Sequence, residues 1–150
     1  MTITIAQYFG HKIDDPSVTA EILVNADDLL RLVNICLADF EAATGKKIGI
    51  DPDTGTKISG AKGGDGDGGF RLPTSTTGVA GSQHRQANAV DVYDLGDHLD
   101  FWLTRTLLIK YGLWREAPPF TKSTPPKQPA GWCHLQRVAP RSGNRSFIPW

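Results

Sequence analysis

The sequence predicts a single α+β domain in which helices pack on one side of a small, mainly antiparallel sheet. Three observations support this fold class. The chain has 150 residues, a length typical of one domain. Apolar residues recur at helical spacing between residues 25 and 45, whereas residues 89–93 and 131–138 have the alternation and composition of short strands. We therefore expect residues 1–150 to form one domain around a central sheet.

The clearest predicted helix runs from Asn25 to Gly45. Asn25 is a favourable N-cap, and Gly45 is a favourable stop. The apolar residues on its broad face are Leu29, Leu30, Val33, Cys36, Leu37 and Phe40. A second helix is expected within residues 95–114, where leucine and aromatic side chains follow helical spacing and Gly112 can end the helix. The first helix is expected to pack against the sheet as scaffold.

The other segments are expected to be short or irregular. Residues 2–9 alternate threonine and isoleucine at their start, which favours an extended segment, and residues 48–50 and 56–59 are also possible extended pieces. The glycine-rich stretch 60–69 is expected to be a surface loop. Prolines recur between residues 115 and 130 and predict an irregular connection there.

Charge is balanced overall but unevenly distributed. Residues 1–100 contain 8 Lys/Arg and 15 Asp/Glu, a net charge of −7, whereas residues 101–150 contain 8 Lys/Arg and one acid, Glu116, a net charge of +7. We expect the two parts to attract each other within the fold. The alternative is a basic surface for an anionic polymer such as cell-wall glycan or nucleic acid. Because aromatic residues are not interleaved with the basic ones, no nucleic-acid partner is expected.

The two cysteines and the hydropathy pattern give further expectations. Cys36 and Cys133 form neither a disulfide framework nor a paired metal motif, so each is expected to be a buried thiol. No stretch approaches the roughly 18 apolar residues of a membrane span, so no membrane partner is expected. The first residues lack a basic start followed by an apolar run, which predicts synthesis in a host cytoplasm without a signal peptide. Residues 138–150 are expected to fold back onto the body.

The most informative stretch is residues 81–93, GSQHRQANAVDVY, which places His84 seven positions before Asp91. Asp91 lies in the first predicted strand, and His84 lies in a loop that can fold back over the start of that strand. His134 lies in the second predicted strand and provides a third ligand of the type that zinc binds. Three protein ligands leave the fourth tetrahedral position for water, which is the arrangement of a catalytic zinc. Taken singly, Asp91 is also explained by a salt bridge and His134 by a core position.

These ligands belong to a longer pattern, Ser82-x-His84-x-x-Ala87-x-Ala89-x-Asp91 followed by Trp132-x-His134. The pattern resembles the zinc-binding motifs of the M15 peptidases, which include D-alanyl-D-alanine carboxypeptidases and phage L-alanyl-D-glutamate endopeptidases. The resemblance covers roughly residues 56–138. It implies that His84, Asp91 and His134 hold zinc and that Ser82 steadies the site. One departure is Ala87, where the family commonly has glycine.

A second segment, Gly69-Phe70-Arg71, resembles the Gly-Tyr-Arg segment that M15 enzymes place before their first zinc motif. The resemblance implies that Arg71 reaches into the cleft, where a guanidinium group suits a substrate carboxylate or a developing oxyanion. The family usually has serine before that glycine, whereas this chain has Gly68. A competing Ser59-Gly60 pair lies upstream, and a salt bridge to an acidic loop is the alternative role for Arg71.

A catalytic carboxylate is missing from its usual place. Peptide hydrolysis requires a proton shuttle for the attacking water and the leaving amine. M15 peptidases commonly carry it as Glu or Asp three residues before the last histidine, and here that residue is Gly131. Glu116, in the segment that we expect to form a wall of the cleft, is a candidate replacement, and Asp94 and Asp97 are others. None of the three has a spacing argument.

The resemblance implies a zinc-dependent peptidase that cleaves peptidoglycan stem peptides, of the endolysin or virion-associated type. Its partners would be the peptide of the cell wall and, if it is carried in a virion, other virion proteins. It would act at the cell wall, in the periplasm or within a virion. The alternative, suggested by Gly131, is a catalytically silent zinc-binding module with a wall-binding or virion-structural role.

Overall fold

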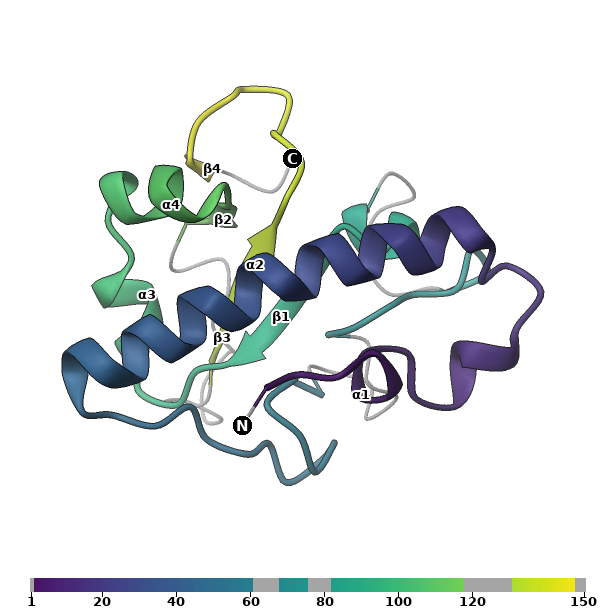
Figure 1. Ribbon diagram of the computed structural model, residues 1–150, viewed down its shortest axis with the longest axis horizontal. Coiled ribbons are helices and arrows are strands. Elements are labelled where there is room, and N and C mark those ends of the chain that lie inside the picture. Colours follow the sequence, from purple (N-terminus) through teal and green to yellow (C-terminus); the bar gives the residue numbers. More distant parts are fainter. Residues whose placement is uncertain (1, 61–67, 76–81, 118–130, 148–150) are drawn as a thin grey trace.

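The computed structural model describes residues 2–60, 68–75, 82–117 and 131–147 (Figure 1). The helices are α1 (Ile5–Phe9), α2 (Ala20–Thr44), α3 (His98–Trp102) and α4 (Arg105–Tyr111), with 3-10 turns η1 (Gly10–Asp14) and η2 (Gln83–Gln86). The strands are β1 (Ala89–Tyr93), β2 (Trp114–Glu116), β3 (Trp132–Gln136) and β4 (Ser146–Phe147). The described residues therefore form an α+β fold. Most of the glycine-rich loop and of the proline-rich connection predicted from the sequence lies outside the described residues.

The four strands form one sheet in the order β1-β3-β2-β4. β3 pairs antiparallel with both β1 and β2, whereas β2 and β4 are parallel. The sheet is thus mixed, and the prediction of a mainly antiparallel sheet was wrong. The cause lies in β3, whose two edges are already occupied. The chain reverses after β3, so β4 runs in the same direction as β2 and pairs with its free edge.

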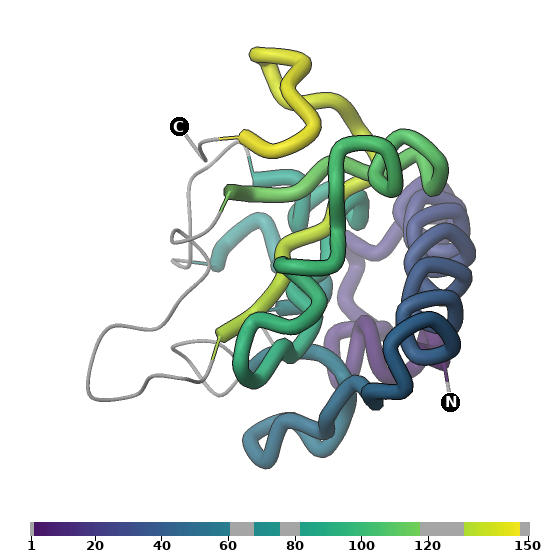
Figure 2. The backbone as a smooth tube through the Cα atoms, turned by 90° about the vertical axis from the view of Figure 1, so that its left-hand side faces the viewer, coloured from purple at the N-terminus to yellow at the C-terminus, as the bar shows by residue number. Residues whose placement is uncertain are grey.

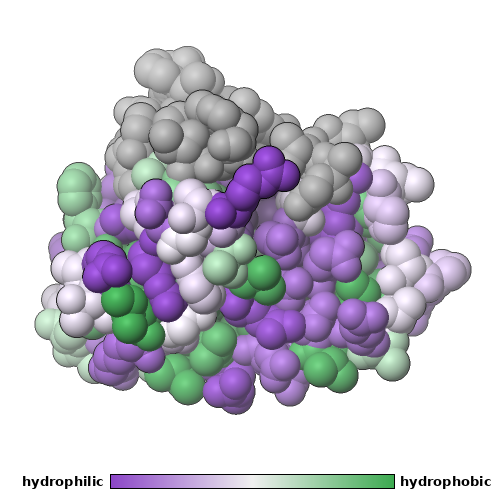
Figure 3. Space-filling view, turned by 90° about the horizontal axis from the view of Figure 1, so that it is seen from above, coloured by the Kyte–Doolittle hydropathy of each residue, from purple (hydrophilic) through white to green (hydrophobic). Residues whose placement is uncertain are grey.

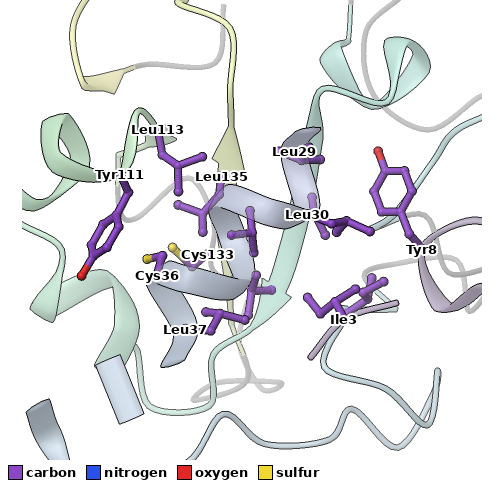
Figure 4. Close-up of a cluster of buried hydrophobic side chains, with 14 of the residues drawn as sticks. Ile3, Tyr8, Leu29, Leu30, Cys36, Leu37, Tyr111, Leu113, Cys133 and Leu135 are labelled. Carbon is purple, nitrogen blue, oxygen red and sulfur yellow. The ribbon is translucent and has the colours of Figure 1, made fainter. Parts of the chain in front are cut away.

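The long helix α2 crosses one face of the sheet and provides much of the core. Figure 2 shows α2 and the strands as separate layers. Figure 4 shows Leu29, Leu30 and Cys36 of α2 in the same cluster as Cys133 and Leu135 of β3. Both cysteines are buried free thiols, as predicted. Burial of apolar surface between these two layers is the main stabilising contribution that the packing provides.

The C-terminus of α2 was predicted correctly, but its N-terminus was not. Gly45 ends the helix in the left-handed conformation with φ of 70°. The helix begins at Ala20, where the side chain of Thr19 accepts the backbone N–H of Ile22. Asn25 lies inside the helix instead of capping it, and its amide group contacts distant parts of the chain. The helix therefore uses an N-cap six residues upstream, and the side chain of Asn25 takes part in tertiary hydrogen bonds instead.

The first residues form a helix instead of the predicted extended segment. Thr4 and Gln7 form a capping box, in which each side chain accepts the backbone N–H of the other residue. This reciprocal pair satisfies N–H groups that a short helix would otherwise leave unpaired. The alternation of threonine and isoleucine was therefore misleading at residues 2–9. Downstream, Tyr8 is fully buried and donates its hydroxyl to the carbonyl of Ala89 in β1.

The second predicted helix is two helices. Leu103 is extended between α3 and α4, and Thr104 then caps α4 by accepting the backbone N–H of Leu107. Gly112 ends α4 in the left-handed conformation, as expected. Residues 48–50 are not a strand, while residues 56–59 contribute only an isolated bridge from Ile58 to Val92 and one from Thr56 to Asp51.

The tail folds back onto the body as far as residue 147, as predicted, and residues 148–150 lie outside the described residues. Phe147 in β4 is buried. Lys110 forms an ion pair with Asp39 of α2 at 3.2 Å, and Arg115 forms one with Asp100 at 3.5 Å. These two contacts join the basic and acidic parts of the sequence.

Figure 3 shows no large hydrophobic patch on the described part of this face, where hydrophilic and hydrophobic residues are mixed. Within the part of the chain that the structure describes, the most exposed large apolar side chain is Phe101. Scattered exposed apolar residues are normal for folded proteins. Among the described residues, no helix is long and apolar enough to cross a membrane.

Candidate metal centre

The three predicted metal ligands lie together on the face of the sheet opposite α2. Asp91 of β1 and His134 of β3 are direct partners in the antiparallel register. Because side chains alternate along a strand, both point away from the core residues that flank them, Val90 and Leu135 among these. His84 comes from η2, which immediately precedes β1. All three side chains are buried.

A left-handed turn places His84 over the start of β1. Ala87 ends η2 with φ of 56° and ψ of 31°, a conformation that favours glycine. Ser82 begins the same turn and accepts the backbone N–H of His84. The position where M15 enzymes commonly have glycine is thus one where the backbone must reverse, and this chain achieves the reversal with alanine. Alanine in place of glycine at position 87 therefore still allows the left-handed turn.

The distances between ligand atoms match those of a metal site. His134 Nδ1 lies 2.9 Å from Asp91 Oδ1, His84 Nε2 lies 3.3 Å from the same oxygen, and the two imidazole nitrogens lie 3.3 Å apart. Two ligands about 2.0 Å from a tetrahedral zinc are separated by about 3.3 Å. These three residues form a group that could hold a metal ion. At these distances the three ligand atoms can bind the same cation.

The other ring nitrogens show which lone pairs point into this centre. His84 Nδ1 lies 2.9 Å from the carbonyl oxygen of Gly69, which can only accept, so this nitrogen carries the hydrogen. His134 Nε2 lies 2.9 Å from Oε1 of Gln136, whose amide nitrogen donates to the carbonyl of Val138. When both imidazoles are neutral and these hydrogens are in place, His84 Nε2 and His134 Nδ1 are bare and face the carboxylate of Asp91. Three lone pairs at such distances repel unless a proton or a cation lies between them.

Arg71 also lies at this centre, where its side chain contacts other residues of the site. Its Nη2 lies 3.3 Å from Oδ2 of Asp91, and its Nη1 donates to the hydroxyl of Ser82 at 3.5 Å. The backbone N–H of Arg71 donates to the carbonyl of His84. The side chain is buried. Arg71 thus neutralises the outer oxygen of Asp91 and leaves Oδ1 facing the imidazoles.

The first helical segments hold the loop that carries Gly69 and Arg71. Phe70 donates its backbone N–H to the carbonyl of Tyr8, and Lys12 donates from Nζ to the carbonyl of Phe70 at 2.8 Å. Lys12 is buried. The N-terminal residues therefore position the carbonyl that orients His84, although nothing in the sequence pattern linked them to the site.

The charges of the cluster shift each pKa in a definite direction. Burial would raise the pKa of Asp91, but the two histidines that face its carboxylate lower it below the usual range. Burial lowers the pKa of His84 more than Asp91 raises it. For His134, burial is outweighed by the hydrogen bond to Asp91 and the nearby negative charges, so its pKa is raised. In the absence of a metal, His134 is therefore the group that keeps a proton.

Glu116 lies beside the cluster. It is in β2, a strand, and not in the irregular connection predicted from the sequence. β2 pairs with β3 through Trp114–Gln136 and Arg115–Leu135, so the same register brings Glu116 opposite His134 and onto its face of the sheet. Burial raises the pKa of Glu116, while the positive charge of His134 lowers it and the charge of Asp91 adds to the increase. Asp91, His134 and Glu116 thus form one row across three strands.

The other proposed replacements lie elsewhere. Asp94 accepts the backbone N–H groups of Leu99 and Asp100 at the start of α3, and it groups with Asp97 and Asp100. Gly131 lies at the start of β3, where its carbonyl accepts the N–H of Asp94. Of the three candidates, the structure brings only Glu116 to the histidines.

Aromatic residues border the row on both sides. Tyr93 and Trp132 are register partners two positions beyond Asp91 and His134, and both are half-buried. The ring of Phe147 lies 6.0 Å from that of His134, centroid to centroid, at 85°. Neither Phe147 nor Gln136 was predicted from the sequence to be part of the site. Phe147 joins it through the pairing of β4 with β2, whereas Gln136 follows His134 by two positions on the same face of β3.

Comparisons of the chain with protein-family models, with curated proteins and with solved structures find no match.

Proposed function

We propose that this chain is a zinc-dependent peptidase that cleaves stem peptides of peptidoglycan, as a phage endolysin or a virion-associated enzyme. The observation that supports the proposal is the convergence of three bare ligand atoms, from His84, Asp91 and His134, with a fourth polar group, Glu116, in the same row. The choice of peptide substrate rests on the resemblance of the sequence motifs to M15 peptidases.

The donor set fits zinc. Two imidazoles and one carboxylate leave a coordination position open, which is the pattern of catalytic zinc sites. When bound in such a site, zinc polarises the substrate carbonyl and lowers the pKa of water to about 7. The same donor set also suits Fe(II). We favour zinc because the motif spacing resembles that of zinc peptidases.

The residues of the chain have separate roles in this proposal. Gly69 holds His84 through Nδ1, which keeps Nε2 available to the metal. Arg71 binds the outer oxygen of Asp91 and so offsets the cost of burying that carboxylate. Ser82 supports both, since its hydroxyl contacts Arg71 and the backbone of His84. We assign Arg71 to the support of Asp91 instead of to a substrate carboxylate.

Glu116 is the proposed proton shuttle. A carboxylate beside the metal ligands can accept a proton from the attacking water and return it to the leaving amine. Burial raises the pKa of Glu116, which brings it closer to the neutral range where such a group works well. Glu116 would thereby replace the carboxylate that M15 enzymes carry at the position of Gly131.

The first test is metal binding and hydrolysis by the full chain. We expect one equivalent of zinc to bind and purified peptidoglycan to release new amino groups. His84→Ala should lose both zinc and activity, whereas His98→Ala, which removes an exposed histidine outside the site, should change neither. A preference for Fe(II) over zinc, or retention of zinc by His84→Ala, would overturn the proposed centre.

The second test separates the enzyme from the silent module. Glu116→Gln should lower the turnover rate by about 10²- to 10⁴-fold while zinc affinity remains close to that of the parent chain. The alternative function, a zinc-holding wall-binding or virion-structural module, is favoured by Gly131 at the usual carboxylate position. Tight zinc binding without any release of amino groups would support the module. An unchanged rate in Glu116→Gln would remove Glu116 as the shuttle.

A further inference from the structure

Gln136 is a buried side chain two residues after His134 on the same face of β3. Its Oε1 lies 2.9 Å from Nε2 of His134. Its Nε2 donates to the carbonyl of Val138 at 2.6 Å. The second bond matters because it turns the NH₂ group toward the carbonyl of Val138 and so presents the oxygen to the imidazole.

From this geometry we infer that Gln136 is a positioning residue that fixes the tautomer of His134 and so selects Nδ1 as its metal-binding atom. With the hydrogen held on Nε2, the Nδ1 lone pair faces Asp91 and His84. The opposite tautomer would place an N–H in the centre and would leave the oxygen of Gln136 facing a bare nitrogen. The inference rests on the metal site of the proposed function but not on hydrolysis.

His84 is also held by a hydrogen bond to the ring nitrogen that faces away from the centre, but its partner is of a different kind. His84 is fixed through its Nδ1 by a backbone carbonyl, and His134 is fixed through its Nε2 by a side chain. A backbone carbonyl cannot be removed by substitution, whereas Gln136 can. Groups that orient a metal ligand in this way typically contribute about 10- to 100-fold in metal affinity. Gln136 is therefore the position where the orientation of a ligand can be tested directly.

The test compares Gln136→Leu with Gln136→Glu. Leucine cannot accept a hydrogen bond, so the hydrogen of neutral His134 should move to Nδ1, where Asp91 lies 2.9 Å away as an acceptor, and zinc affinity should fall by about 10- to 100-fold. Glutamate still accepts the Nε2 hydrogen, although it loses the donation to Val138, so it should keep the tautomer and hold zinc affinity within about 10-fold of the parent chain. Zinc affinity is measured by competition with a chelating dye, and the tautomer by long-range ¹H–¹⁵N NMR of metal-free protein at a pH where His134 is neutral.

The outcomes separate this inference from the proposed function. A purely structural role predicts that Gln136→Glu, which introduces a buried charge, is at least as damaging as Gln136→Leu, and that result would overturn the inference. So would a parent chain in which neutral His134 carries its hydrogen on Nδ1, a measurement that requires no variant to fold. If the parent chain binds no zinc, the proposed function fails, while the NMR measurement still decides whether Gln136 sets the tautomer.

Discussion

The two faces of the β1–β3 pair are built from alternate residues of the same strands, but different interactions stabilise them: apolar packing on one face and hydrogen bonds on the other. One face carries Val90, Val92 and Leu135, which are completely buried within the hydrophobic core. The other face carries Asp91 and His134, which are equally hidden but hydrogen-bonded at 2.9 Å. The difference shows that burial alone does not distinguish scaffold from site.

The two faces should respond to substitution in different ways. Apolar packing is non-directional, so its contribution grows with the area buried and tolerates changes of shape that conserve volume. The polar face is directional, because each buried donor or acceptor needs its own partner. Changes on the first face should therefore alter stability, and changes on the second should alter metal binding.

The largest expected effect on stability is on the core face. Leu135→Ala removes a side chain packed against the α2 layer and should lower the free energy of unfolding by about 2–5 kcal/mol. Leu135→Met conserves volume and should cost less than about 1.5 kcal/mol. Chemical denaturation in the presence of a chelator measures both. Zinc affinity of the folded Leu135→Ala protein should stay close to that of the parent, and a large loss would show that the faces are not independent.

The second prediction concerns protons on the polar face. Because the pKa of His134 is raised while those of His84 and Asp91 are lowered, the metal-free site near pH 6 should hold one proton, on His134. Zinc must displace it, so below the pKa of His134 the zinc affinity should rise by up to about tenfold per pH unit, or about 1.4 kcal/mol. Calorimetry in buffers of different ionisation enthalpy should show about one proton released from the protein near pH 6. Release of two protons would mean that His84 is also protonated.

The smallest expected effect is at the turn that joins the two regions. Ala87→Gly relieves the left-handed backbone, which costs alanine about 1–2 kcal/mol. The change also removes a fully buried methyl group, worth about 0.8 kcal/mol. The two contributions partly cancel, so the free energy of unfolding, measured by thermal or chemical unfolding, should rise by no more than about 1 kcal/mol. A loss above about 2 kcal/mol would show that the packing of the methyl group dominates.

Local pattern identified much of this fold. The bounds of β1 and the end of α2 followed from residue alternation, β-branched content and the glycine at position 45, all of which act within a few neighbouring residues. The start of α2 and the helix α1 were mispredicted. In the first case distant contacts of Asn25 compete with its capping preference, and in the second a reciprocal cap outweighed an alternating pattern.

By itself the sequence indicated which residues can bind a metal, because the motif that contains His84 and Asp91 and the alternation around His134 are local patterns; the pairing of β1 with β3 then brings Asp91 and His134 together. Only the tertiary structure decided which groups surround them. Glu116 reaches His134 through strand pairing, and Arg71 reaches Asp91 through a loop held by the N-terminal residues. Gln136 lies in the same strand as His134, but the structure is needed to show that its side chain bonds to the imidazole. Pairing between strands is a long-range choice that depends on which edges are free, and no short motif records it.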